Sequence, residues 1–175
     1  MGKRSIGTFL KQKKGAGQKI GAVLVAVALS GMLPDRSAAQ GACREDTLWI
    51  KGDWGQARFS VEVADTFDER AQGLMNRPAM AASGGMIFIY ERTGPVSFWM
   101  KNTLIPLDML FADEAGVIQH IHHEAIPLDE TPIPGGEAIR YVLEINGGMA
   151  KSLGITKGSA MRHPFFLQEI ANWRC

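Results

Sequence analysis

The sequence Phe98-Trp99-Met100-Lys101-Asn102-Thr103, followed by Pro106-Leu107-Asp108, is the most unusual stretch of this chain. In an extended strand alternate side chains point to opposite faces, so Trp99, Lys101 and Thr103 would share one face. Neither face is wholly apolar, and a polar group on a packed face needs a partner. The stretch therefore predicts a strand where an apolar core meets polar and charged side chains.

Short segments rich in Val, Ile, Phe and Tyr surround this stretch and alternate with turn residues. The sequence Asp113-Glu114-Ala115-Gly116 between two of them predicts a hairpin turn with Gly116 in the left-handed conformation. The pattern predicts a predominantly antiparallel α+β domain, folded as a compact, partly open barrel or a sandwich. The predicted extended segments are residues 59–64, 86–90, 96–101, 107–112, 117–124, 139–145 and 160–168.

Two short helices are expected between the strands. The sequence Thr66-Phe67-Asp68-Glu69 fits a capping box, which predicts a helix from Phe67 to about Leu74. A second helix is expected to start around Asn146-Gly147-Gly148 and to end at Gly154. The glycines at its start either serve a turn or offer backbone N–H donors to a ligand.

The first 39 residues have the order of a secretory signal peptide. A basic stretch ends at Lys19, an apolar run covers residues 20–33, and small residues lead up to Ala39. The apolar run is shorter than the about 20 residues that a bilayer span needs. We expect Sec-type cleavage near Ala39 and a periplasmic or secreted protein that is free of the membrane afterwards. An uncleaved inner-membrane anchor is the alternative.

The exported part is divided into a polar N-terminal lead-in, residues 40–57, and a compact domain, residues 58–175. Beyond residue 39 the chain has 12 Lys and Arg against 17 Asp and Glu. A domain without a basic excess is poorly suited to neutralise phosphates, so nucleic-acid binding is not expected. We expect a monomer.

The chain has two cysteines, Cys43 and Cys175. In an oxidising compartment they can pair, which would close nearly the whole domain in one loop. Two unpaired thiols on frayed ends are the alternative. Neither cysteine lies in a Cys-x-x-Cys motif, so redox catalysis is not expected.

Asp108 and Glu144 interrupt apolar segments, residues 107–111 and 141–145. If both carboxylates point inward they need cationic partners, as a structural ion network or as part of a ligand cleft. In an enzyme the same two residues would be the general acid and base. The available cations are Arg70, Arg77, Lys101 and Arg140. The candidate ligand-binding residues, for a small polar or anionic ligand, are Arg70, Arg77, Trp99, Lys101, Asn102 and Asp108.

His120, His122 and Glu124 alternate along one predicted strand and would share a face. Imidazole and carboxylate suit zinc, but one strand rarely completes a coordination sphere, so a second element such as His163 would be needed. A solvated edge-strand face explains the same pattern. We expect no metal and no other cofactor.

Six motifs in order along the chain resemble those of DUF192, a family of domains of unknown function. The resemblance covers about residues 59–165 and implies a small, largely β prokaryotic domain, often exported or membrane-anchored, with no established activity. The histidines at 120–123 are not part of the family pattern. The motifs are Arg70 with Gly73-Leu74-Met75-x-Arg77, Gly85-Met86-Ile87-Phe88, Phe98 to Thr103, Ile105-Pro106-Leu107-Asp108, Val142-Leu143-Glu144 with Gly148, and Gly158.

These observations lead to two functional hypotheses. The first is a small non-enzymatic envelope domain that binds a small polar ligand or an envelope partner through a cleft around Trp99, Lys101 and Arg70. The alternative is an envelope hydrolase or lyase that uses Asp108 and Glu144 as paired carboxylates. The position of these two side chains relative to each other distinguishes the hypotheses.

Overall fold

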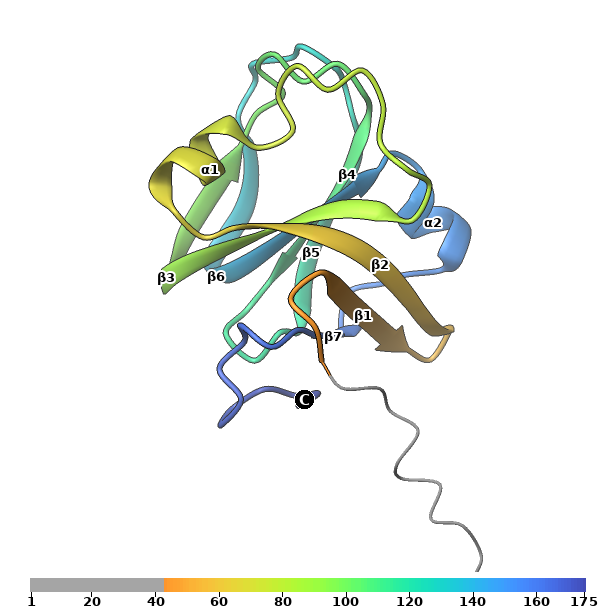
Figure 1. The fold of residues 1–175 in the computed structure, drawn as a ribbon, viewed down its shortest axis with the longest axis vertical. Helices are drawn as coiled ribbons and strands as arrows, with labels where there is room; N and C mark the ends of the chain where they lie inside the picture. The colour runs from red at the N-terminus through yellow and green to blue at the C-terminus, as the bar shows by residue number, and fades with distance from the viewer. Residues whose placement is uncertain (1–42) are drawn as a thin grey trace, which may run out of the picture. The chain divides into compact units, whose positions relative to one another are not determined.

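The computed structural model describes residues 43–175, which form seven strands and two short helices (Figure 1). The predicted signal peptide, residues 1–39, lies outside the described residues. In residues 43–175 no helix is long and apolar enough to cross a membrane. The elements are β1 (Thr47–Gly52), β2 (Gly55–Ala64), α1 (Phe67–Gln72), β3 (Gly84–Phe98), β4 (Leu107–Ala112), β5 (Ile118–Ala125), β6 (Ile133–Asn146), α2 (Met149–Leu153) and β7 (Ala160–Arg162).

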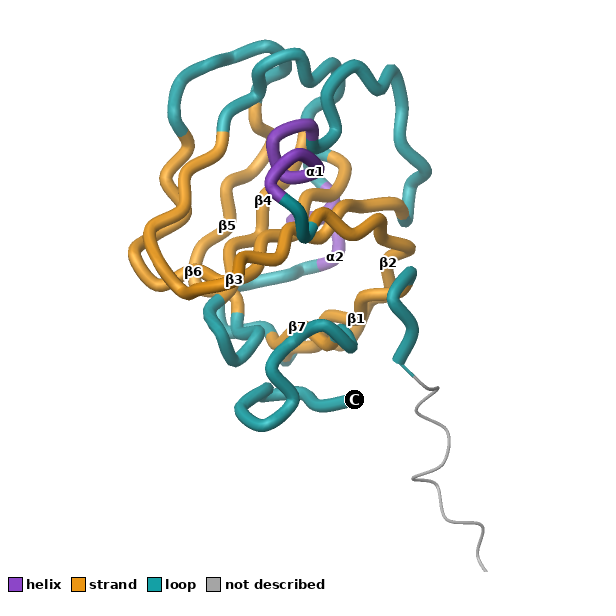
Figure 2. The backbone as a smooth tube through the Cα atoms, turned by 60° about the vertical axis from the view of Figure 1, so that its left-hand side comes forward, coloured by secondary structure: helices purple, strands orange, loops and turns teal. Residues whose placement is uncertain are grey.

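The strands of this described part form one mixed sheet in the order β5-β4-β6-β3-β2-β1-β7. β2 and β3 are parallel, and the other neighbours are antiparallel. A bridge between Val117 and Ala160, with Ile118 N–H donating to the Ser159 carbonyl at 2.9 Å, brings the two edge strands together at one end. The sheet is therefore a half-barrel (Figure 2). This confirms the predicted α+β, mostly antiparallel class and, of the barrel and the sandwich that the sequence left open, the partly open barrel.

The sheet separates two apolar cores because side chains alternate along each strand. Leu110 of β4 and Leu143 of β6 belong to the first core, inside the half-barrel, whereas Met109 and Phe111 belong to the second. All six residues of β4 are buried, since both of its faces are covered. A polar residue in β4 or β6 must therefore find its partner inside the protein.

The compact domain begins earlier than the sequence analysis placed it. Residues 47–57, assigned there to a lead-in, form β1 and the start of β2, and Leu48 and Ile50 are fully buried in the first core. β1 is held between β2 and β7, a partner that arrives more than a hundred residues later in the chain. The short apolar run alone did not reveal this long-range pairing.

The stretch 96–101 is not a separate strand. β3 runs unbroken from Gly84 and ends at Phe98, so Trp99, Lys101 and Thr103 lie in a loop and do not share a strand face. Met100 anchors this loop: it is fully buried, and its N–H donates to the Asp129 carbonyl at 2.8 Å. The last strand is also shorter than predicted, since β7 ends at Arg162, just before Pro164.

Both helices form where the sequence predicts them. Thr66 and Glu69 make the capping box of α1 in both directions, and the helix ends before Gly73, whose φ of 48° is in the left-handed region. The start of α2 at Met149 follows Gly148, also left-handed with φ 79°. The hairpin turn is present too, with Gly116 at φ 74°.

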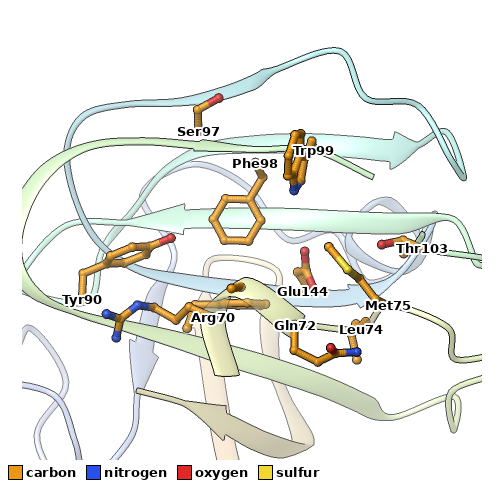
Figure 3. Close-up of a pocket in the computed structure, with 13 residues that line it drawn as sticks. Arg70, Gln72, Leu74, Met75, Tyr90, Ser97, Phe98, Trp99, Thr103 and Glu144 are labelled. Atoms are coloured by element: carbon orange, nitrogen blue, oxygen red, sulfur yellow. The ribbon is translucent and has the colours of Figure 1, made fainter. Parts of the chain in front are cut away.

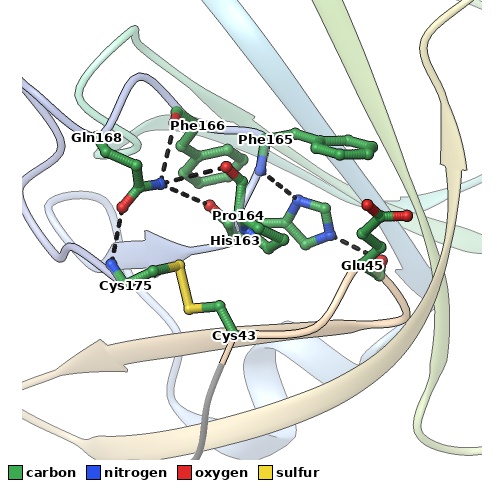
Figure 4. The surroundings of a disulfide bond; sticks show 8 residues. All are labelled: Cys43, Glu45, His163, Pro164, Phe165, Phe166, Gln168 and Cys175. Carbon is green, nitrogen blue, oxygen red and sulfur yellow. Dashed lines mark hydrogen bonds between the residues drawn. A yellow bond between two sulfur atoms is a disulfide. The ribbon is translucent and has the colours of Figure 1, made fainter.

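Cys43 and Cys175 are joined by a disulfide with an Sγ–Sγ distance of 2.07 Å (Figure 4). Beside it, Cys175 N–H donates to the side-chain oxygen of Gln168 at 2.8 Å. The bond ties the segment that leads into β1 to the C-terminal tail, which has no strand of its own after β7. Of the two alternatives left open by the sequence, the structure contains the paired form.

Candidate functional site

Asp108 of β4 is a fully buried carboxylate that binds three backbone N–H groups. Its Oδ1 accepts hydrogen bonds from Glu124 N–H at 2.8 Å and Gly148 N–H at 3.0 Å, and its Oδ2 accepts one from Ala150 N–H at 2.7 Å. Asp108 therefore joins β4 to the end of β5 and to the first turn of α2. Of the two glycine N–H groups suggested from the sequence as ligand donors, that of Gly148 donates to this side chain and that of Gly147 donates to the Pro106 carbonyl at 2.8 Å. Among the residues described, backbone donors take the place of the expected Arg or Lys partner.

Glu144 of β6 is buried but lacks such partners. It is 4% exposed, and no hydrogen bond or ion pair joins its carboxyl to another residue in the range 43–175. Burial raises the pKa of the Glu144 carboxyl to about 8, because the charged form is poorly solvated there. At neutral pH this group is therefore largely protonated, and it can both donate and accept a hydrogen bond.

The two carboxyl groups point to opposite faces of the sheet. Asp108 is paired with Ile145 and Met109 with Glu144 in the β4–β6 ladder. Residues directly opposite each other share a face, and successive residues alternate, so Glu144 is on the side of the second core and Asp108 on the side of the first. The predicted acid–base pair therefore does not share a site.

A cavity of about 90 Å³ opens over Glu144, between α1, β3 and the loops that follow them (Figure 3). We call it the Glu144 cavity. Figure 3 shows the Glu144 carboxyl in the middle, with Trp99 and Phe98 above it. The lining residues are Arg70, Ala71, Gln72, Gly73, Leu74, Met75, Phe88, Tyr90, Ser97, Phe98, Trp99, Thr103 and Glu144.

Of the ligand-binding residues predicted from the sequence, Arg70 and Trp99 line this cavity. Arg70 donates to the backbone carbonyls of Asp65 and Ile89, the latter at 2.9 Å, so its guanidinium is held by the connection between β2 and α1 and by β3. In Figure 3 the guanidinium points away from Glu144 and towards Tyr90. Trp99 stands at the cavity with 48% of its surface exposed.

Lys101 and Asn102 support the cavity from outside its lining. The Lys101 ammonium lies 5.1 Å from the centre of the Trp99 ring. Asn102 has a left-handed backbone, with φ 53°, and its carbonyl accepts a hydrogen bond from Asn76 N–H at 2.8 Å. This bond ties the loop after β3 to the loop after α1, so Asn102 shapes the cavity without lining it.

Arg77 lies elsewhere. Its guanidinium forms a two-pronged ion pair with Glu62 of β2, with one of the two contacts at 2.6 Å, and both side chains are partly exposed. The pair holds the pKa of Glu62 below its ordinary value, chiefly through the hydrogen bond from Arg77. The sequence grouped Arg77 with Arg70, but the structure separates their roles.

The cavity also uses residues to which the sequence analysis assigned no role in binding. Tyr90, Met75 and Phe98 form much of its wall, and Phe98 packs edge-on against Phe88 with ring centres 4.9 Å apart. Phe98 and Met75 belong to the family motifs quoted above, so the motifs could have identified them as part of the site. Tyr90 lies at the end of a predicted strand, and no feature of the sequence pointed to it.

The histidines do not form a metal-binding group in this structure. A β-bulge and the left-handed Glu124, with φ 51°, interrupt the alternation after His122. His163 is fully buried at the disulfide end of the domain, where its Nε2 lies 2.8 Å from the Glu45 carbonyl (Figure 4). In residues 43–175 no three His, Cys, Asp or Glu side chains are arranged to hold a metal ion.

A second hollow, an open groove of about 750 Å³, is larger than the Glu144 cavity. It lies beside Asp113, Gln119, His120 and residues 134–139. None of its polar side chains is buried, and Asp113 is occupied by the backbone N–H groups of Ala115 and Val117. A buried, unpaired polar group in a concave site is the stronger sign of function, so the Glu144 cavity is the better candidate.

The half-barrel and the buried Glu144 carboxyl on one side of its sheet define a small α+β domain with an acidic, aromatic-walled cavity. The chain belongs to the DUF192 family, described as "Uncharacterized ACR, COG1430", whose model matches residues 49–163. No curated protein matches it.

Two solved structures are similar to this chain, each with a TM-score of 0.65. A protein of unknown function from Novosphingobium aromaticivorans is 40% identical, over 66% of this chain and 82% of that one. A protein of Sinorhizobium meliloti, described as "a putative transcription regulator", is 39% identical, over 70% of this chain and 95% of that one.

The raised pKa of Glu144 predicts that the domain loses stability in mildly alkaline solution. The folded state keeps the Glu144 proton, whereas the unfolded chain releases it near pH 4.5. The contribution of this proton to the free energy of unfolding is therefore complete below about pH 4.5 and is lost as the pH rises to about 8. Between pH 6.5 and 8.5 the free energy of unfolding should fall by about 2 kcal/mol.

Urea titrations of the wild type and Glu144→Gln across this range measure the effect. The window starts at pH 6.5 because burial lowers the pKa of His120 and His163 below that ordinary value, so the neutral form of both imidazoles predominates in it. Glu144→Gln should lose most of the pH dependence and become the more stable protein at pH 8.5. If the free energy of unfolding changed with pH in the same way in both proteins, Glu144 would be ionised in the folded state at neutral pH.

Proposed function

We propose that this protein is an exported, monomeric, non-enzymatic envelope domain that binds a small polar ligand in the Glu144 cavity. The observation that carries the proposal is a buried carboxyl without a partner among the described residues, at the bottom of a cavity with an exposed tryptophan at its mouth. Burying an unsatisfied polar group costs free energy, typically about 1–3 kcal/mol. A ligand that hydrogen-bonds to Glu144 would recover part of this cost.

Export is supported by the disulfide between Cys43 and Cys175. Disulfides persist in the periplasm and outside the cell, whereas cytosolic thiols are usually kept reduced. The signal-like order of residues 1–39 points the same way. Together these features favour an envelope or secreted location over an intracellular one.

The alternative of a hydrolase or lyase with paired carboxylates has lost its geometric support. Asp108 and Glu144 face opposite sides of the sheet, and Asp108 is occupied by three backbone donors. A regulator that binds DNA is not proposed either, because the chain beyond residue 39 has 12 basic and 17 acidic side chains. Binding of a small molecule remains the function that the geometry supports best.

Thermal-shift screening against sugars, amino acids, nucleotides and amines, followed by NMR titration of the hits, tests this proposal. A true ligand should move the Trp99 indole signal, and Trp99→Ala should weaken its binding at least about tenfold, since an exposed ring can be removed without unfolding the domain. Phe67→Ala is the matched control, because Phe67 is an exposed aromatic side chain of α1 that does not line the cavity. A panel with no binder, or hits that ignore Trp99→Ala, would refute the assignment.

A further inference from the structure

The walls of the Glu144 cavity are unusually aromatic for a space of about 90 Å³. Phe88, Tyr90 and Phe98 of β3 and the adjoining Trp99 all line it. Aromatic rings carry negative charge on their faces and attract cations placed over them, and several rings around one point are how proteins hold quaternary ammonium groups.

Two rings of this cavity already attract cations of the protein itself. The Arg70 guanidinium lies over Tyr90, 5.2 Å from the ring centre, and the Lys101 ammonium lies over Trp99 at 5.1 Å. Neither cation pairs with Glu144, because Arg70 is held by backbone carbonyls and Lys101 is outside the lining. The acid in the centre is therefore left without a counter-charge in this part of the chain.

The remaining charges near the cavity argue against an anionic ligand. An anion in the cavity would lie next to the Glu144 carboxyl. The two nearby cations would not compensate for this, because Arg70 faces backbone carbonyls and Lys101 faces the Trp99 ring. A cation, in contrast, would favour the ionised form of the Glu144 carboxyl, which is largely protonated at neutral pH in the free protein, and would also interact with the ring faces. The cavity has room for a few water-sized groups, so it fits the charged end of a ligand while the rest extends past Trp99.

We propose that the Glu144 cavity binds an alkylammonium group, the cationic end of an organic amine, with Glu144 as its counter-charge and the rings of Tyr90, Phe98 and Trp99 around it. The proposal rests on the proposed function and names its ligand class. It narrows the small polar ligand of the proposed function to a cation, in place of the anionic ligand that was also expected from the sequence.

Binding of a cation should depend on pH, because the carboxyl must be ionised to act as a counter-charge. The titratable or charged side chains that line the cavity around Glu144 or contact its lining are Tyr90 of β3, Arg70 of α1 and Lys101 in the loop after β3. β4 presents the apolar Met109, with His122 of β5 beyond it. Burial raises the pKa of Tyr90 to about 12 and that of Glu144 to about 8, so Glu144 is the one of these two acids in the lining that ionises between pH 6.5 and 8.5.

Three probes of nearly the same shape test the proposal: choline, its neutral carbon analogue 3,3-dimethylbutan-1-ol, and the anion 3,3-dimethylbutanoate. Affinities are measured by isothermal titration calorimetry at pH 6.5 and 8.5, at constant ionic strength, and NMR titration of the Trp99 indole locates the site in every protein that keeps Trp99. Choline should bind at least about tenfold more tightly than either analogue at pH 8.5. Its affinity should rise at least about tenfold from pH 6.5 to 8.5, as the carboxyl ionises.

Glu144→Gln should remove the preference for choline and its pH dependence. Glu62→Gln makes the same chemical change at a surface ion pair outside the cavity and should leave both intact. Trp99→Ala should weaken choline binding while the domain stays folded.

Equal binding of choline and the neutral alcohol, or preference for the anion, would overturn the cation proposal but leave a ligand-binding cavity. The same holds if only non-amine members of the screening panel bind at Trp99. If no compound of any class binds, both the cation proposal and the proposed function fail.

Discussion

Asp108→Ala should destabilise the domain by about 3–5 kcal/mol, enough to unfold a large part of a marginally stable protein. The carboxylate is fully buried and accepts hydrogen bonds from Glu124, Gly148 and Ala150 N–H groups. Alanine leaves all three donors without their partner, and each unsatisfied buried donor costs about 1–3 kcal/mol, less where water can enter. The left-handed backbone of Glu124, with φ 51°, also loses the bond that holds it.

Urea denaturation followed by circular dichroism measures this effect. Asp108→Asn keeps one acceptor oxygen and should give an intermediate loss. Asp129→Ala is the control, because Asp129 is an exposed carboxylate that accepts a single hydrogen bond from Thr131 N–H, and its removal should cost less than about 1 kcal/mol. If Asp108→Ala were no more harmful than Asp129→Ala, Asp108 would not be the connection between β4, β5 and α2.

Removing the disulfide with Cys43→Ala and Cys175→Ala together should lower the free energy of unfolding by about 4–5 kcal/mol. The two cysteines are 132 residues apart, so the bond closes a very long loop and greatly restricts the unfolded chain. The folded tail keeps other contacts, such as Lys51 over the Trp173 ring at 4.6 Å. The loss should therefore come mainly from the unfolded state.

Denaturation of the oxidised wild type, the reduced wild type and the double variant separates these contributions. Reduction and mutation should lower stability by similar amounts. The Trp99 indole signal of the folded protein should stay unchanged, because β3 and β6, which line the cavity, are not neighbours of β1 or β7 in the sheet. A loss below about 1 kcal/mol in both cases would mean that the ends are already restricted in the unfolded chain.

Much of the fold could be predicted because it depends on neighbours in the sequence. The capping box of α1 joins residues three positions apart, and the turn at Gly116 depends on one backbone conformation. The bounds of β4 were predicted to the residue, since its apolar run ends in a turn on one side and follows Pro106 on the other. β1 was missed because its burial depends on β7, which pairs with it from the other end of the chain.

The candidate site was only partly predictable. Arg70, Trp99 and Glu144 were singled out from the sequence, and they do line one cavity. Asp108 and Arg77 were grouped with them but are occupied by backbone donors and by Glu62. A sequence shows that a charge interrupts an apolar strand, but it does not show whether the partner is another charge, a backbone group or a ligand.

The sequence by itself determined the β-rich class of the domain, the positions of most strands and the presence of two acids in apolar strands. Only the tertiary structure decided that Asp108 and Glu144 face opposite cores, because that depends on the register between β4 and β6. Alternation and capping act over a few residues, whereas register is decided by packing between segments that are far apart in the chain. The same long-range packing brings α1 and the loops over Glu144 and leaves its carboxyl open to the cavity.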